Sequence, residues 1–138
     1  MHRHGYKGRK FGRERDQRRA LRRGLMIALF EHGKIETTEA KAKEIRRYAE
    51  KLITRARKGG LTNRRLVIAR LNNLKMANKL VDEIAPKIKR DSGYLRVTRT
   101  RLRVGDNAQM ATIAFVDDLT VKEKKPEKSN EKEVTDGK

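Results

Sequence analysis

The distribution of apolar and polar residues predicts a first helix over about residues 14–32, with a stop at Gly33. The first half of this helix carries arginine on every side, whereas residues 25–30 are apolar all round. An all-round apolar segment is typical of a buried helix. We therefore expect one rod whose C-terminal half packs inside the protein and whose basic N-terminal half lies outside it.

A second helix is expected to begin at a cap provided by Thr37 or Thr38 and to end at Gly59-Gly60. Its apolar positions fall within one stripe, about 100° wide at helical spacing. This stripe consists of Ile45, Ala49, Leu52, Ile53 and Ala56. The opposite face is basic, and Glu39, Glu44 and Glu50 alternate with its basic residues as carboxylates do in surface ion pairs.

Two shorter helices are expected to follow. Leu61 and Thr62 have the pattern of a hydrophobic staple and a cap for a helix that runs to about Leu71, and Asn72-Asn73 mark a break. Apolar residues at helical spacing then predict a fourth helix, which cannot continue far beyond Pro86.

Three segments have the composition of strands. Residues 34–37 form a short candidate strand, and residues 94–100 and 110–116 are rich in β-branched and aromatic side chains. The last two are expected to pair as a C-terminal antiparallel hairpin. The predicted fold class is therefore α+β, with about four helices in one domain (residues 14–118), preceded by a basic arm (residues 1–13) and followed by a disordered Lys/Glu tail (residues 119–138).

The charge of the chain indicates a binding partner. The chain holds 37 Lys and Arg against 18 Asp and Glu, a formal net charge of +19, and residues 1–116 alone hold 31 against 11. A compact domain tolerates such self-repulsion poorly unless a polyanion neutralises it, and nucleic acid is the obvious polyanion. The longest apolar run is residues 25–30, so neither a signal peptide nor a membrane span is expected, and the absence of Cys fits a reducing cytosol.

The first 23 residues hold ten basic and two acidic side chains. Such a segment cannot bury enough apolar surface to fold alone, so we expect its first dozen residues to be extended and to become ordered only against RNA. The predicted contacts are Arg3, His4, Lys7, Arg9, Lys10, Arg13, Arg15, Arg18, Arg19, Arg22 and Arg23. The alternative is a solvated charge run, but the release of counterions from RNA rewards this clustering. Tyr6 and Phe11 could stack on unpaired bases, and Phe11 could instead pack on the domain.

Two further groups of basic residues are candidates for RNA contact. Lys34, Lys41 and Lys43 flank the start of the second helix, where backbone amides can hold a phosphate; the alternative is a simple capped surface helix. The hairpin and its loop carry Arg96, Arg99, Arg101 and Arg103. These are expected to contact phosphate, and the alternative is a solvated sheet edge that charge protects from aggregation.

Other functions find little support. His2, His4 and His32 lack Cys or carboxylate partners at ligand spacing, so no metal site is expected. No nucleophile elbow, phosphate loop or dinucleotide fingerprint occurs, so we expect no enzyme, cofactor or small-molecule substrate. A DNA regulator would use the third and fourth helices as a helix-turn-helix, but residues 74–86 are nearly balanced in charge. An RNA-modifying enzyme would need a cofactor pocket for which no residues are found.

The segment IETTEAKAKEIRRYAEKLITRAR, residues 35–57, closely resembles the signature region of the bacterial large-subunit ribosomal protein family numbered seventeen. Residues 1–13, 29–33, 82–86 and the hairpin loop are similar to that family too, so the resemblance extends to about residue 118. Gln109 stands where the family usually has Pro, and His2 is an extra residue.

The resemblance implies a two-layer α/β domain with helices on one face of a small sheet. It also implies a structural constituent of the large (50S) ribosomal subunit that binds and stabilises 23S-type rRNA and supports translation in the cytoplasm. A small ribosomal protein, the one numbered thirty-two, would be a neighbour.

Overall fold

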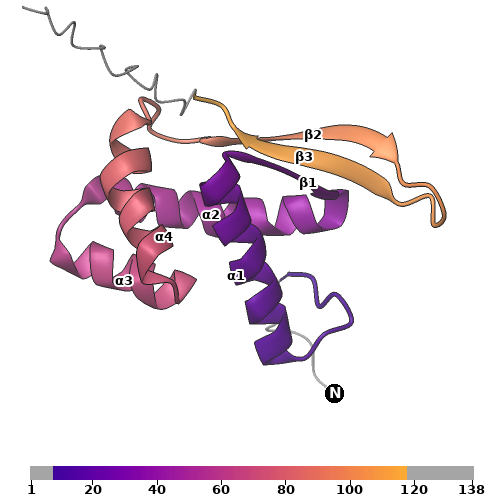
Figure 1. The fold of residues 1–138 in the computed structure, drawn as a ribbon, viewed down its shortest axis with the longest axis horizontal. Coiled ribbons are helices and arrows are strands. Elements are labelled where there is room, and N and C mark those ends of the chain that lie inside the picture. The colour runs from indigo at the N-terminus through magenta and orange to yellow at the C-terminus, as the bar shows by residue number, and fades with distance from the viewer. Residues whose placement is uncertain (1–7, 118–138) are drawn as a thin grey trace, which may run out of the picture.

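The computed structural model describes residues 8–117 (Figure 1). The expectations for Arg3, His4, Tyr6, Lys7 and the tail concern residues outside this range, and they stay predictions. Within it, the four expected helices and three expected strands are all present. They are α1 (Arg15–His32), β1 (Lys34–Thr38), α2 (Glu39–Lys58), α3 (Leu61–Leu71), α4 (Leu74–Asn78), β2 (Leu95–Leu102) and β3 (Gln109–Phe115).

The helix ends follow the predicted breaks, but not every predicted cap. Gly33 adopts the left-handed conformation (φ 74°) and its N–H donates to the carbonyl of Leu29, which closes α1. The prediction of a cap at Thr62 is wrong, because α3 already begins at Leu61 after Gly60. Thr38 precedes α2 as expected, but its hydroxyl makes no capping hydrogen bond.

The fourth helix changes its winding before it ends. After α4 the backbone continues as a π-helical segment, η1 (Lys79–Ile84), and a short 3₁₀ turn, η2 (Ala85–Lys87). Pro86 lacks an N–H, and in a regular α-helix its ring clashes with the carbonyl four residues earlier. The helix therefore ends close to the predicted position, although only Leu74–Asn78 is a regular α-helix.

The three strands form one antiparallel sheet in the order β1-β3-β2. The predicted hairpin of β2 and β3 is confirmed, and β1 pairs with the other edge of β3, so that Ile35, Ile113 and Val97 form one row across the sheet. α2 contacts all three strands and runs beneath the sheet in Figure 1. This packing produces the helix and sheet layers that the resemblance implies.

The core lies between α2, the other helices and the inner face of the sheet. All five residues of the apolar stripe predicted for α2 are buried, which confirms that interpretation. The all-round burial predicted for residues 25–30 is only partly correct: Met26, Leu29 and Phe30 are buried, but Leu25 and Ile27 are half-exposed. The reason is that α1 packs against the domain along one side only.

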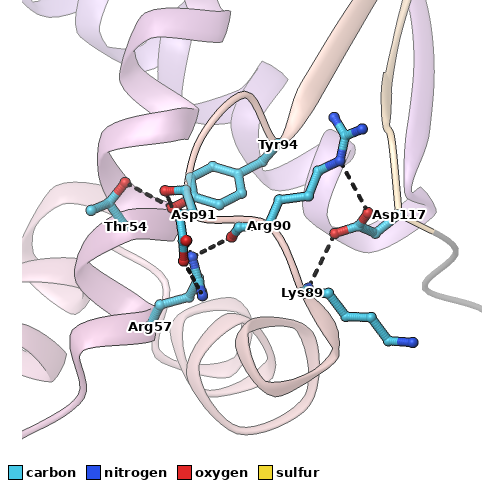
Figure 2. Close-up of polar contacts among 7 residues, drawn as sticks. All are labelled: Thr54, Arg57, Lys89, Arg90, Asp91, Tyr94 and Asp117. Carbon is cyan, nitrogen blue, oxygen red and sulfur yellow. Dashed lines mark hydrogen bonds and ion pairs between the residues drawn. The ribbon is translucent and has the colours of Figure 1, made fainter.

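A cluster of polar contacts joins the segment before β2 to α2 (Figure 2). The ring of Tyr94 is buried, and its hydroxyl donates to the carbonyl of Asp91 at 2.6 Å and accepts from Arg57 and Thr54. Arg57 also pairs with the carboxylate of Asp91 at 3.2 Å, and Arg90 pairs with Asp117 at 3.4 Å. Hydrogen bonding to Tyr94 and Asp91 raises the pKa of Arg57. These contacts hold β2 and the end of β3 against the helices.

Candidate nucleic-acid interface

The described part of the arm bends back on itself before α1. Phe11 and Gly12 have φ values of 56° and 61°, and the N–H of Arg13 donates to the carbonyl of Lys10. Residues 8–13 thus contain a turn, where an extended conformation was predicted. The side chains of Arg9, Lys10 and Arg13 are exposed, whereas Phe11 is half-buried.

The predicted basic residues of α1 divide into two groups. Arg15 and Arg19 are exposed, whereas Arg18, Arg22 and Arg23 are half-buried. The difference arises because Arg18 and Arg22, one turn apart, lie on the side of α1 that turns toward the protein. The basic half of α1 is therefore less fully outside the domain than the sequence pattern predicts.

Arg22 belongs to a contact between α1, α2 and the arm. Its guanidinium lies 4.5 Å from the centre of the Tyr48 ring, a cation–π contact, and 3.9 Å from the carboxylate of Glu44. The Glu44 side chain is only 7% exposed, so its prediction as a surface ion-pair residue is wrong. A Cβ on Gly8 would lie 2.7 Å from the Glu44 carboxylate, which shows how closely the arm approaches α2 there.

At the start of α2, Lys43 lies next to a carboxylate. Glu39 in the first turn pairs with Lys43 at 2.7 Å and with Arg99 of β2 at 2.9 Å. The hydrogen bond from Lys43, and then that from Arg99, lowers the pKa of Glu39. Lys34 is exposed and Lys41 is half-buried. An incoming phosphate would meet the negative charge of Glu39 at this helix end.

Three of the four hairpin arginines are paired within the chain. Besides Arg99, Arg101 pairs with Glu36 at 3.4 Å and Arg103 pairs with Asp106 across the loop. Hydrogen bonding to Arg103 lowers the pKa of Asp106 to about 2. Arg96 is exposed and has no ion pair with the described residues. The hairpin is thus closer to internal charge balance than the sequence indicates.

A hollow of about 590 Å³ lies between α1, α2 and α3, and we call it the helix groove. Tyr48 lines it together with the apolar residues Met26, Leu52, Leu66 and Ala69. Its basic lining residues are Arg19, Arg22, Arg23, Lys51, Arg55 and Arg70. Tyr48, Arg55 and Arg70 were not among the predicted site residues. Spacings of three and four residues on each helix are the signal that could have found them.

Within residues 8–117, neither a metal site nor a membrane-spanning helix is found. No group of three or more His, Cys, Asp or Glu side chains there is arranged to hold a metal ion. In the same part of the chain, no helix is long and apolar enough to cross a membrane.

Fold and surface together define a small, basic α+β protein in which six basic side chains line the helix groove between α1, α2 and α3. Residues 21–116 match the family model of ribosomal protein L17. Relatives described as large ribosomal subunit protein bL17, from Campylobacter jejuni subsp. doylei and Campylobacter lari, are each 55% identical over 116 residues, covering 83% of this chain and 97% of theirs. One from Helicobacter hepaticus is 54% identical over 116 residues, covering 83% of this chain and 98% of its own.

The chain belongs to the ribosomal protein L17 family. It is accordingly a structural protein of the large subunit of the bacterial, cytoplasmic ribosome and takes part in translation, and it is not an enzyme. The resemblance drawn from residues 35–57 is confirmed, and the interpretation as a helix-turn-helix regulator is not supported.

Proposed function

We propose that the protein binds and stabilises large-subunit rRNA through its basic arm, the N-terminal half of α1 and the β2–β3 hairpin. The observation that carries this proposal is uncompensated charge, since residues 1–116 hold 31 Lys and Arg against 11 Asp and Glu. A cation that displaces counterions from RNA phosphates gains free energy without needing a particular sequence. Membership in a ribosomal family supports rRNA as the polyanion.

The three parts of this interface are expected to contribute unequally. Arg15 and Arg19 are exposed and make no ion pair with a carboxylate among the described residues, so each is available to a phosphate. Before binding a phosphate, three hairpin arginines must each give up the carboxylate with which they pair: Arg99, Arg101 and Arg103. Because exposed ion pairs contribute only about 0–1 kcal/mol, this exchange is possible but reduces the gain. The arm and α1 should therefore supply most of the salt-dependent affinity.

A salt titration tests the arm and α1 directly. The double variant Arg13→Gln/Arg15→Gln removes two exposed cations, and Arg46→Gln/Arg90→Gln removes two cations that pair with Glu50 and Asp117. Filter binding to large-subunit rRNA between 50 and 200 mM salt should show a slope lower by up to about 1.4–1.8 for the first variant. The control variant should change the slope by less than half as much.

Circular dichroism establishes that both double variants are folded. Equal slopes for the unsubstituted protein and Arg13→Gln/Arg15→Gln would contradict the role of the arm and α1. Equal losses in the two variants would show that only the total charge matters.

We also propose the ribosomal protein numbered thirty-two as a neighbour, as the resemblance implies. The hairpin end supports a protein contact, since Leu102 and Val104 are 51% and 95% exposed there. A photoreactive group attached through Val104→Cys should cross-link to that protein in assembled large subunits. Cross-links to rRNA alone would contradict this proposal.

A further inference from the structure

We propose that the helix groove binds one unpaired nucleotide of RNA, with its base against Tyr48 and the apolar floor and its neighbouring phosphates on the basic rim. This inference rests on the proposed function and assigns a specific ligand to a surface outside the hairpin. The groove volume of about 590 Å³ lies within the range of about 300–1,000 Å³ that is usual for small-molecule sites.

The groove is assembled from one face of each of three helices. α1 contributes Arg19, Arg22, Arg23 and Met26, which lie on one side of the helix at successive turns. α2 contributes Tyr48, Leu52 and Arg55 with the same spacing. Met26 and Leu52 are each 5% exposed and form the floor, so they belong to the core as well. The floor is therefore rigid and apolar, and the ends of longer basic side chains surround it.

The charge of the groove differs from that of a second hollow on α2. The second hollow contains Arg46, Arg47, Lys43 and Arg99, but Glu39 and Glu50 line it too and pair with three of these cations. The helix groove has six cations and no lining carboxylate. One of the six cations, Arg22, pairs with a carboxylate that does not line the groove, that of the buried Glu44. Six cations held together against one nearby carboxylate attract an anion, and phosphate supplies it.

The apolar floor and aromatic ring distinguish a nucleotide from a bare phosphate backbone. Tyr48 is 36% exposed and Leu66 is 37% exposed, so part of the lining is available to a flat apolar ligand. Arg22 already covers Tyr48 at 4.5 Å, and a guanidinium plane is itself a surface on which bases stack. A paired base inside a duplex cannot present its face, whereas an unpaired base can.

The lining is held in place before any ligand arrives. Arg22 is 17% exposed and is fixed between Tyr48 and Glu44, and the Nε of Arg23 donates to the carbonyl of Arg70 at 3.2 Å. This last bond joins α1 to α3 across the groove. Side chains that are already ordered lose less conformational entropy on binding, which favours a specific site over a diffuse one.

Binding of two RNA hairpins to the full-length protein tests the inference. One hairpin carries a single bulged 2-aminopurine, and the other is the same hairpin without the bulge. The protein should prefer the bulged hairpin at least about fivefold, and 2-aminopurine fluorescence should fall on binding, as stacking requires. Tyr48→Ala should reduce the preference below about twofold, and Tyr48→Phe should retain it.

The outcomes separate this inference from the proposed function. Failure to bind either hairpin at physiological salt would contradict RNA binding itself. Equal binding of both hairpins, or an unchanged preference in Tyr48→Ala, would overturn the groove assignment alone.

A cross-link in the assembled subunit identifies the occupant. Because the chain contains no Cys, Leu66→Cys provides a single attachment point for a benzophenone at the groove. A cross-link to one rRNA position that chemical probing shows to be unpaired supports the assignment. A cross-link to a protein, or to paired rRNA, or the absence of any adduct, would overturn it.

Discussion

Replacing Glu44 by Gln is expected to destabilise the protein, even though the chain carries a large excess of positive charge. The Glu44 side chain is 7% exposed and lies 3.9 Å from the guanidinium of Arg22, which is itself 17% exposed. Gln preserves the size of the side chain but removes its charge. Arg22 would then remain shielded from water without its counter-charge, a situation that costs free energy.

The magnitude follows from the burial of this pair. A hydrogen bond or contact to a charged group contributes about 1.5–3 kcal/mol, and breaking a fully buried ion pair costs about 3–5 kcal/mol. The separation of 3.9 Å and the residual exposure of Arg22 place Glu44→Gln in the lower range, about 1.5–3 kcal/mol. For the described residues this corresponds to a Tm lower by roughly 5–15 °C.

Glu50→Gln is the matched control, because it changes charge equally on the same helix. Glu50 pairs with Arg46 at 3.1 Å on the surface of α2, a type of pair that contributes only about 0.3–0.5 kcal/mol. Thermal unfolding of both variants, followed by circular dichroism at one salt concentration, measures the difference. Equal losses of Tm, or no loss in Glu44→Gln, would refute the argument from burial.

Three other changes have defined outcomes. Gly8→Ala should release the arm from α2, because Gly8 has φ +113° and its new Cβ would lie 2.7 Å from the carboxylate of Glu44. Faster proteolytic cleavage of the segment before α1 would show this release. An unchanged cleavage rate would contradict it. Tyr94→Phe should lower the free energy of unfolding, measured in urea, by about 1–2 kcal/mol, since the buried hydroxyl has three hydrogen-bond partners. A decrease below about 0.5 kcal/mol would argue against that network. Arg103 stabilises ionised Asp106, whose pKa of about 2 lies below its usual 3.8. This contribution is therefore present above about pH 4 and is lost as pH falls through 2, and an NMR titration giving Asp106 an ordinary pKa would contradict it.

Local patterns were sufficient for most of the secondary structure. The stripe from Ile45 to Ala56 could be predicted because one helix face repeats every 3.6 residues whatever packs against it. Gly33 and Asn72 ended helices as predicted, since both positions have positive φ. The hairpin was predicted because its two strands share a composition and lie close in sequence.

The charge pairing could not be predicted, because it depends on residues far apart in the chain. Arg99 meets Glu39 sixty residues away, and Arg101 meets Glu36 only because β1 and β2 flank the same strand. Glu44 was expected on the surface because a single-helix pattern does not show that the arm and α1 cover it. The helix groove was missed for the same reason, since no one helix contains it.

The sheet order β1-β3-β2 has a consequence for synthesis of the chain. The middle strand is the last to be translated, and Phe115 is added 77 residues after Thr38 ends β1. At about 5–20 residues per second, the first strand waits roughly 4–15 s for its partner. Until then both outer strands expose unpaired backbone, so a nascent polypeptide that terminates early leaves two open edges that other chains can join.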